Sequence, residues 1–467
     1  MDHIRIFVDF GSTFTKVCAF DMDKEELAGW AKYPSTVDTD VTIGLREALK
    51  LLGEQVEFSE ENLRSACACS SAAGGLRIVC IGLTPELTTK AARLAAFGAG
   101  AKIVGTYSYR IKEEDITAIE ALAPDIVLLA GGIDGGDKKS IIHNASLLAR
   151  CGERLGTVIV AGNKSAYDEI DYIFSESGKR VLYSKNILPS FGTLDVDSVN
   201  ETIRSVFLDE IVSAKGIDKA RSLISKILVP TPVAVLQAAA LAADGVENEE
   251  QGFGDLLLVD VGGATTDVYS VCDGCPTMQG VNLIGLIEPR VKRTVEGDLG
   301  LYHNLDTLSD SAVSRGLALE DGMDSRLKSN FSIPETEGLK RRHVALTRLA
   351  VRTAVERHCG ELQPLFTGNG IVHVQKGKDL SDVPALIGLG GPIVFSPDRA
   401  EVLSGAVKTA GDDTRLLPVK PQLYIDERYI LFALGLMAET EPGKAMRLFR
   451  KYIRKVQGHE PVCSFAE

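Results

Sequence analysis

The sequence predicts an α/β protein built from two related lobes, and three observations lead to this prediction. The chain has 467 residues, which is more than a single hydrophobic core of ordinary size accommodates. A hairpin motif of one pattern occurs twice, in Ile4–Val17 and again in Leu256–Val268. Between the two copies, short apolar runs alternate with amphipathic stretches. This alternation is typical of a largely parallel sheet that helices cover on both faces.

Each copy of the repeated motif is an apolar strand that ends in an aspartate. A turn of glycine and hydroxyl residues follows, and then a second strand returns. Asp9 ends the strand of the first copy, and Asp260 stands at the corresponding place in the second copy. The pattern predicts a β-hairpin with a specialised turn. Its recurrence predicts two lobes of common architecture.

The segment between the two copies contains predicted strands and helices in alternation. The predicted strands are Arg77–Ile81, Lys102–Gly105, Asp125–Ala130, Thr157–Ala161 and Arg180–Tyr183, and the predicted helices are Glu86–Gly98, Glu113–Ala123 and Ser165–Ser175. Two of these strands run into glycine-containing loops, Ala130–Gly132 and Ala161–Asn163. A loop at the carboxyl edge of a parallel sheet could face a ligand. A tight strand-to-helix turn without a ligand is an equal alternative.

Composition and charge exclude several classes of function. Hydrophobic residues make up 45% of the chain and charged residues 25%, as in ordinary globular proteins. The formal net charge of −13 argues against a nucleic-acid binder, which normally carries a basic face. The N-terminus lacks the apolar stretch of a signal peptide, and the most apolar segment, Ile227–Ala243, contains two prolines and falls short of a membrane span. We expect a cytoplasmic protein that binds neither nucleic acid nor membrane.

The nine cysteines are scattered along the chain, which fits reduced thiols in a cytosol. Cys272 and Cys275 have the spacing of a metal-binding pair. However, no second pair exists and no histidine lies near them in the sequence. A turn that contains two thiols is therefore favoured over a zinc or redox site.

The repeated turns are suited to binding the phosphates of ATP. A turn of Gly, Ser and Thr brings backbone N–H groups and hydroxyls close to an anion, because little side chain intervenes. Two such turns that face each other could hold the phosphates from both sides. Asp9 and Asp260 would then supply carboxylate oxygens for Mg²⁺ through its water shell, because Mg²⁺ keeps several of its waters.

The sequence resembles the superfamily of actin, sugar kinases and heat-shock chaperones, whose ATP site is built from five motifs in a fixed order. The matching segments are a first phosphate motif at Asp9–Lys16, a first connecting helix at Val229–Ala238, a second phosphate motif at Asp260–Asp267, an adenosine motif at Ile387–Pro392 and a second connecting helix at Ile430–Leu436. The resemblance implies two ribonuclease-H-like lobes with a nucleotide cleft between them. It implies a first lobe at residues 1–248, a second at 249–418, and a segment at 419–467 that returns to the first lobe.

The resemblance also implies roles for individual residues. Asp9 and Asp260 would be catalytic and would hold Mg²⁺ through water, whereas Gln237 would either orient the attacking water or be a core-facing amide. The implied phosphate contacts are Gly11, Ser12, Thr13 and Lys16 in the first turn and Gly262, Gly263, Ala264 and Thr265 in the second. The residues implied to lie against adenosine are Gly388, Gly390 and Gly391. Glu296–Asp298 would be either a loop of the nucleotide cleft or an exposed acidic turn.

Five segments resemble a narrower family, and they are Phe10–Lys16, Ser70–Leu76, Leu129–Gly136, Asp260–Val268 and Arg293–Gly300. This is the GlmL family, whose members are encoded beside glutamate (methylaspartate) mutase and related cobalamin-dependent aminomutases. The family is unrelated to the mismatch-repair protein that shares its older name. The resemblance implies an ATPase, with ATP and Mg²⁺ as cofactors, that acts as an accessory or reactivating chaperone of a mutase and lets damaged cobalamin leave.

Other functions on the same fold remain as alternatives. A small-molecule kinase would need a general-base carboxylate in the cleft, and no residue of the sequence is identified as that base. A hydantoinase- or oxoprolinase-like amidohydrolase shares a similar second phosphate motif, and a filament-forming actin relative is a further alternative. The partner mutase and the oligomeric state are open. The basic and apolar residues interleaved from Lys444 to Lys455 predict a C-terminal capping helix, with a positive partner-binding surface as the alternative.

Overall fold

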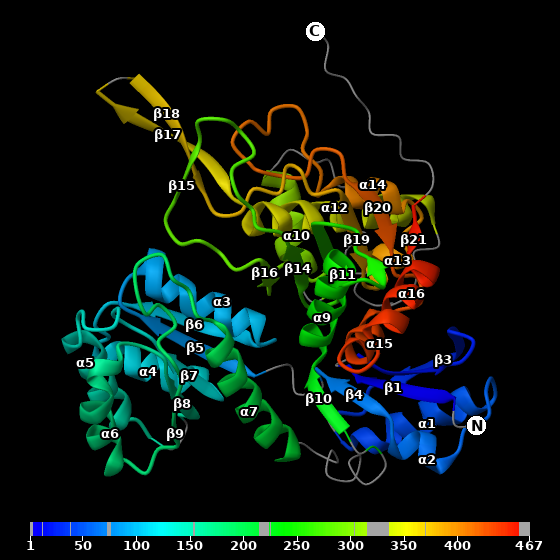
Figure 1. Cartoon of the computed structure of the whole chain (residues 1–467), viewed down its shortest axis with the longest axis horizontal. Helices are drawn as coiled ribbons and strands as arrows, with labels where there is room; N and C mark the ends of the chain where they lie inside the picture. Colours follow the sequence, from blue (N-terminus) through cyan, green and yellow to red (C-terminus); the bar gives the residue numbers. More distant parts are fainter. Residues whose placement is uncertain are drawn as a thin grey trace. The chain divides into compact units, whose positions relative to one another are not determined.

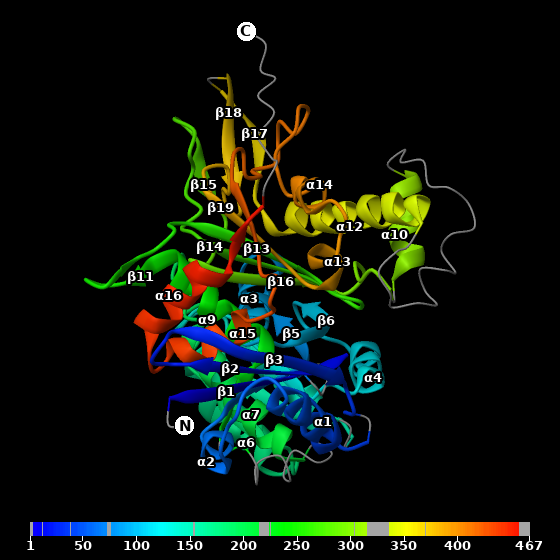
Figure 2. The same cartoon turned by 90° about the vertical axis from the view of Figure 1, so that its right-hand side faces the viewer.

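The computed structural model describes residues 3–11, 13–37, 39–71, 76–152, 155–213, 224, 226–302, 304–314, 336–368 and 370–456 (Figures 1 and 2). The chain divides into two compact units. Unit 1 consists of Met1–Ala238, Gly285–Ile287 and Phe432–Lys444, and unit 2 consists of Ala239–Ile284, Glu288–Leu431 and Ala445–Glu467. The domain limits expected from the sequence, at residues 248 and 418, stay a prediction.

The first hairpin motif lies in a mixed five-stranded sheet of unit 1. The strand order is β10 (Lys226–Pro230), β4 (Cys67–Ser70), β1 (Ile4–Phe10), β2 (Phe14–Asp21) and β3 (Glu26–Pro34). β1, β2 and β3 pair antiparallel, whereas β4 is parallel to both β1 and β10. The apolar residues of β1 are buried. Helices α1 (Val41–Gly53) and α2 (Glu60–Arg64) connect β3 to β4.

The second hairpin motif lies in a sheet of unit 2 that has the same topology. The strand order is β16 (Val291–Glu296), β14 (Thr266–Val271), β13 (Leu256–Val261), β19 (Ala385–Leu389), β20 (Gln422–Ile425) and β21 (Arg454–Lys455). β13, β14 and β16 pair antiparallel, and β19 is parallel to β13 and β20. β16-β14-β13-β19-β20 therefore repeats β3-β2-β1-β4-β10. This repetition confirms the predicted α/β fold class of two ribonuclease-H-like lobes.

A helix follows the last parallel strand of each sheet, as the two connecting-helix motifs predict. α9 (Thr231–Asp244) follows β10, and α15 (Leu431–Ala438) follows β20. A Cβ atom on Gly435 would lie 1.8 Å from the backbone oxygen of Ala234. The two helices thus cross with their backbones in contact within unit 1. The absence of a side chain at Gly435 permits this close crossing.

Unit 1 contains a second sheet, which is entirely parallel. Its order is β6 (Lys102–Ser108), β5 (Arg77–Gly82), β7 (Ile126–Leu129), β8 (Thr157–Val160) and β9 (Val181–Tyr183). In β5, Ile78 and Cys80 belong to one hydrophobic cluster, while Val79 and Ile81 belong to another. Both faces of the sheet are therefore buried, as predicted from the alternation of strands and helices.

Helices of the expected type separate the strands of this parallel sheet. They are α3 (Lys90–Gly98), α4 (Glu113–Leu122), α5 (Lys139–Ala149) and α6 (Tyr167–Ser175). A π-helical turn, Pro85–Thr89, precedes α3, and a 3-10 turn, Lys164–Ala166, precedes α6. α7 (Asp197–Ser213) follows β9. The predicted strands and helices of residues 77–183 are thus confirmed, with small changes at their ends.

The two glycine loops of this sheet have a packing reason for their glycines. Gly132 has a φ of +71°, and a Cβ atom there would lie 2.2 Å from the backbone oxygen of Asp137. A Cβ atom on Gly162 would lie 2.4 Å from Ile141. The tight-turn alternative therefore accounts for these residues, and a ligand at the loops stays a prediction.

The core of unit 2 lies between its six-stranded sheet and the long helix α12 (Glu337–His358). Figure 2 shows α12 beside α10 (Leu305–Ser314). Short helices α13 (Gly391–Val394) and α14 (Arg399–Ser404) follow β19. A two-stranded sheet joins β11 (Gly245–Val246) to β12 (Glu250–Gln251), and a three-stranded sheet has the order β15 (Asn282–Ile284), β18 (Gly370–Lys376) and β17 (Glu361–Thr367).

The C-terminal helix is shorter than the sequence predicted. α16 spans Pro442–Tyr452, and Arg454 and Lys455 instead form β21, which pairs with β20. The expectation of helix up to Lys455 was wrong because strand pairing takes these last two residues. Arg447 and Arg450 pair with Glu250 at 3.4 and 2.8 Å. No helix in the described ranges is long and apolar enough to cross a membrane.

Candidate functional site

The first phosphate turn is closed by its own backbone. Asp9 lies opposite Lys16 in the β1–β2 register, and the N–H of Gly11 donates to the backbone oxygen of Phe14 at 3.1 Å. A Cβ atom on Gly11 would lie 2.6 Å from that same oxygen, so the turn requires glycine. Thr13 is exposed at the tip. Ser12 lies outside the described residues.

Asp9 is buried, with 1% of its surface exposed, and both of its carboxylate oxygens accept hydrogen bonds. Lys16 Nζ donates to Oδ2 at 3.0 Å, and Thr231 Oγ1 donates to Oδ1 at 2.6 Å. Cys69 Sγ lies 3.6 Å from Oδ1 as a further donor. Burial and the neighbouring Asp9 carboxylate raise the pKa of the Cys69 thiol well above its usual value, so the thiol keeps its proton and can donate it.

The second phosphate turn repeats the closure of the first. Asp260 lies opposite Asp267 in the β13–β14 register, and the N–H of Gly262 donates to the backbone oxygen of Thr265 at 2.8 Å. This bond is the counterpart of the one between Gly11 and Phe14. The two turns are therefore alike in hydrogen bonding as well as in sequence.

The second turn also rests on the chain that follows β16. The N–H of Leu301 donates to the backbone oxygen of Gly262 at 3.1 Å, and that of Tyr302 donates to Gly263 at 3.0 Å. Asn304 Nδ2 donates to the backbone oxygen of Ala264 at 2.8 Å. These three bonds hold the turn in place from the side of residues 301–304.

The adenosine motif lies against the strand that carries Asp260. Gly390 has a φ of +82°, and a Cβ atom there would lie 2.1 Å from the Val261 oxygen and 2.5 Å from Asp260 Oδ1. The adenosine motif and the second phosphate motif of unit 2 thus come into contact at Gly390. Burial and the Asp260 carboxylate raise the pKa of the Tyr429 phenol.

The other two glycines of the adenosine motif have different surroundings. A Cβ atom on Gly388 would lie 2.8 Å from Ile393, so this glycine permits close packing in the core. A Cβ atom on Gly391 would meet only Tyr429 Oη at 3.6 Å and a ring carbon of Phe395 at 3.9 Å, which are ordinary contacts. Gly391 thus has room for a Cβ atom beside two aromatic side chains, which the sequence motif did not indicate.

Gln237 is not beside Asp9 in the structure. Its Nε2 donates to Glu439 Oε1 at 3.1 Å, and its Oε1 is buried without a hydrogen-bond partner in the described part of the chain. The residue of α9 that contacts Asp9 is Thr231, at the start of the helix. At about 1.5 Å of rise per residue, Gln237 lies roughly 9 Å further along. A water-orienting role for Gln237 stays a prediction, with the core-facing amide as its alternative.

Sequence comparison assigns the chain to a family. The family model described as MutL protein matches residues 5–453. The chain belongs to the MutL family. Protein MutL of Clostridium tetanomorphum is 43% identical to it over 460 residues, which cover 97% of this chain and 99% of that protein.

Solved structures share the fold only distantly. A glycerol dehydratase reactivase is 12% identical and has a TM-score of 0.34, with 93% of this chain and 99% of that chain covered. Xylulose kinase from Rhodospirillum rubrum is 13% identical with a TM-score of 0.33, over 98% and 94% of the chains. The ethanolamine utilization protein EutJ from Carboxydothermus hydrogenoformans is 10% identical with a TM-score of 0.28, over 95% and 89%. At these scores the likenesses carry no argument about function.

In this MutL-family chain, an ion pair that the motif did not reveal joins the two strands β14 and β16 beside the second turn. Arg293, on β16, is buried, and its Nε and Nη2 donate to Asp267 Oδ1 at 2.9 and 2.5 Å. Thr265 Oγ1 donates to the other oxygen of Asp267 at 3.1 Å. The first hairpin differs in this respect. Lys16 occupies there the position that Asp267 occupies in the second hairpin, and it forms an ion pair with Asp9. Only strand pairing brings Arg293 next to Asp267, so no local signal in the sequence could have shown it.

The acidic segment Glu296–Asp298 is paired with a cation of α12. Arg357 Nη1 lies 2.7 Å from Glu296 Oε2 and 2.8 Å from Asp298 Oδ1. The hydrogen bond from Arg357 lowers the pKa of Asp298. The ion pairs with Arg357 explain the acidic residues of this segment by a structural role. A role of the segment as a loop of the nucleotide cleft stays a prediction.

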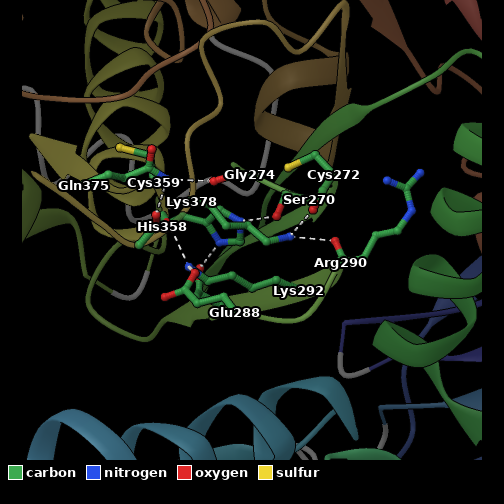
Figure 3. Close-up of polar contacts among 12 residues, drawn as sticks. Ser270, Cys272, Gly274, Glu288, Arg290, Lys292, His358, Cys359, Gln375 and Lys378 are labelled. Atoms are coloured by element: carbon green, nitrogen blue, oxygen red, sulfur yellow. Dashed lines mark hydrogen bonds and ion pairs between the residues drawn. The ribbon is translucent and has the colours of Figure 1, made fainter. Parts of the chain in front are cut away.

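A second polar cluster of the MutL-family chain lies in the core of unit 2 (Figure 3). Lys378 is 1% exposed, and its Nζ donates to the backbone oxygens of Cys272 and Arg290 at 2.7 and 2.6 Å. Burial lowers the pKa of Lys378 to about 8. Lys292 Nζ lies 2.6 Å from both Glu288 Oε2 and the His358 oxygen. The cluster thus holds the chain around Cys272 by buried hydrogen bonds.

The two cysteines with metal spacing differ in exposure, since Cys272 is buried and Cys275 is exposed. Burial raises the pKa of the Cys272 thiol. The described stretches of the chain contain no group of three or more His, Cys, Asp or Glu side chains that could hold a metal ion. The role of the pair stays open.

Proposed function

We propose that this MutL-family chain is an Mg–ATP-binding ATPase that serves as an accessory or reactivating chaperone of a cobalamin-dependent aminomutase. The observation that carries the proposal is the repeated hairpin. In each unit, an aspartate at the end of a strand adjoins a glycine turn that is closed by an equivalent backbone hydrogen bond. Glycine turns of this kind are suited to phosphate binding, because little side chain separates an anion from their backbone and hydroxyls.

The residues present fit a hydrated magnesium ion. Mg²⁺ is usually bound by one or two carboxylates together with waters and substrate phosphates, and Asp9 and Asp260 would each supply one carboxylate through water. Bound Mg²⁺ would neutralise charge that develops on the phosphates. Asp9 accepts a hydrogen bond from Lys16 at 3.0 Å, so one cation already lies beside this carboxylate on the side of the turn.

The nucleotide contacts follow from the two turns and the adenosine motif. Gly11, Ser12, Thr13 and Lys16 would contact the phosphates from unit 1, and Gly262, Gly263, Ala264 and Thr265 from unit 2. Of the adenosine-motif glycines, Gly391 has room for a Cβ atom and lies beside Phe395 and Tyr429, and aromatic side chains of this kind would suit a purine. Gly388 and Gly390 would act by allowing the backbone to pack closely.

The accessory role rests on the resemblance to the GlmL family and on membership of the MutL family. Its partner would be glutamate (methylaspartate) mutase or a related enzyme in the cytoplasm. Binding and hydrolysis of ATP would drive a rearrangement of the lobes, which would open the mutase and release damaged cobalamin. The resemblance supports this role as a family property.

The first test is ATP hydrolysis by the purified chain and by Asp9→Asn and Asp260→Asn. We expect each substitution to reduce Mg²⁺-dependent hydrolysis by a factor on the order of 100, as for removal of other groups that stabilise charge in a transition state. Asp168→Asn in unit 1 and Asp413→Asn in unit 2 are matched controls, because both aspartates are exposed and lie in neither hairpin. Near-normal hydrolysis by either site variant would refute the role assigned to that aspartate, and a wild type that does not hydrolyse ATP would refute the ATPase proposal.

The second test addresses the partner. Glutamate mutase loaded with hydroxocobalamin is inactive, and the chain together with ATP should restore its activity when adenosylcobalamin is added. ADP or the Asp9→Asn variant should not restore it. Phosphorylation of a small molecule without any reactivation would instead favour the kinase alternative.

A further inference from the structure

We infer that Thr231 is a positioning residue for Asp9, and that its hydroxyl holds the carboxylate in the orientation that serves Mg²⁺. This inference rests on the proposed ATPase function. Thr231 Oγ1 lies 2.6 Å from Asp9 Oδ1, although the two residues are 222 positions apart in the sequence. A hydroxyl has a single proton to donate, and a hydrogen bond to an ionised carboxylate is among the strong ones.

The two oxygens of Asp9 are distinguished by their surroundings. Oδ1 receives Thr231 Oγ1 and Cys69 Sγ. Oδ2 receives Lys16 Nζ and lies 3.7 Å from the place where a Cβ atom of Gly11 would be. Oδ2 is therefore the oxygen on the side of the phosphate turn, and Oδ1 is the oxygen that is anchored to the interior of unit 1.

Thr231 is well placed to control this orientation. It starts α9 directly after Pro230, the last residue of β10, and it is held by helix and strand on its two sides. Cys69, the other donor to Oδ1, is at the longer distance of 3.6 Å and is a weak donor. Without the hydroxyl of Thr231, Oδ1 would lose its shortest hydrogen bond, and the carboxylate would depend on Lys16 at Oδ2 to resist rotation about its Cβ–Cγ bond. Oδ2 would then be held less firmly toward the turn.

The test compares Thr231→Val with Thr231→Ser. Valine has nearly the shape of threonine but no donor, whereas serine keeps the donor. The measured quantity is the Mg²⁺ concentration at half-saturation for binding of a fluorescent ATP analogue, with Mg²⁺-dependent ATP hydrolysis as a second readout. A hydrogen bond to a charged group contributes enough for roughly a 10-fold change. We expect Thr231→Val to raise the half-saturating Mg²⁺ concentration about 10-fold and Thr231→Ser to retain the wild-type value.

Binding of the analogue in EDTA separates positioning from general damage to the fold. Thr231→Val should bind the analogue without Mg²⁺ as the wild type does, because only the carboxylate is affected. Thr202→Val is the matched control in unit 1, since its hydroxyl donates to the backbone oxygen of Ser198 and its loss should not change the Mg²⁺ dependence. Equal weakening with and without Mg²⁺ would mean a structural role and would overturn the inference.

Failure of the inference can be distinguished from failure of the proposed function. An unchanged Mg²⁺ dependence in Thr231→Val, with an active wild type, overturns the role of Thr231 alone. Should the valine variant not fold, a wild-type-like Mg²⁺ dependence in Thr231→Ser supports the role, and a 10-fold weaker one in that folded variant overturns it. A wild type that shows no Mg²⁺-dependent binding or hydrolysis of ATP overturns the inference and the proposed function together.

Discussion

Replacing Gly390 by alanine should destabilise unit 2, and replacing the adjacent Gly391 should not. Gly390 has φ +82° and ψ 152°, a region that is essentially restricted to glycine. A Cβ atom there would also come within 2.1 Å of the Val261 backbone oxygen and 2.5 Å of Asp260 Oδ1. Gly391 lacks both problems, since its Cβ atom would meet atoms no closer than 3.6 Å.

The size of the effect follows from these two terms. A non-glycine residue in such a backbone region costs roughly 1–3 kcal/mol, and overpacking against fixed atoms costs roughly another 1–3 kcal/mol. For a domain of about 150–250 residues, each kcal/mol lowers the melting temperature by about 2–4 °C. Gly390→Ala should therefore lower the melting temperature of unit 2 by roughly 5 °C or more. Gly391→Ala should change it by no more than about 2 °C, because such sites usually vary within about 0.5 kcal/mol.

Thermal unfolding of the full chain, followed by fluorescence and by calorimetry, measures both variants against the wild type. Equal melting temperatures for Gly390→Ala and Gly391→Ala would refute the reasoning, because the two differ only in backbone conformation and in the space for one carbon. The larger Gly391→Val should keep the fold yet weaken binding of a fluorescent ATP analogue more than it slows hydrolysis of bound nucleotide. Unchanged affinity would count against the adenosine motif.

Two further predictions concern the buried lysine and the response to ATP. Burial lowers the pKa of Lys378 to about 8, below the ordinary value of about 10.4, so between these two pH values the unfolded chain binds the proton that the folded chain has lost. The wild type should therefore gain stability relative to Lys378→Met as the pH rises from about 8 to about 10.4, with a constant difference below pH 8, and a melting-temperature difference that does not vary with pH would contradict this. ATP should favour a more compact arrangement than ADP does in small-angle scattering, because both turns are expected to contact the γ-phosphate; moving a balanced population to about 99:1 takes roughly 2.7 kcal/mol of differential affinity. Identical profiles, together with mutase affinity that is indifferent to nucleotide, would refute the chaperone role but leave ATP binding standing.

Local patterns were sufficient to predict the elements on which the proposed site stands. The hairpins around Asp9 and Asp260 join strands that are adjacent in the sequence, so alternating apolar residues and a glycine turn already specify their pairing. The repeat of the motif predicted two sheets of one topology, and the order of strands in the structure confirmed it. The second connecting helix, which the superfamily resemblance implied, contains Gly435, and the structure shows that this glycine packs against the backbone of Ala234.

The contacts that shape the site were beyond the reach of such patterns. The sequence left Gln237 either as a water-orienting residue or as a core-facing amide, and it did not indicate Thr231, which the structure brings to Asp9. A motif places a helix near a site but does not fix its rotation or its distance along the axis. One signal was available, because β1, β4 and β10 are parallel and the residues at their carboxyl ends must meet at one edge.

The sequence by itself determined that the chain is a duplicated α/β protein with one aspartate beside each glycine turn, since strand, turn and helix signals act over a few residues. Only the tertiary structure decided what each aspartate contacts. Thr231 contacts Asp9 although the two are 222 positions apart in the sequence. Arg293 on β16 contacts Asp267 on the neighbouring strand β14. Gly390 leaves room for the side chain of Asp260. Such contacts depend on how whole sheets and helices pack, and hydrophobic packing is non-directional. No local run of residues therefore encodes which side chains it will bring together.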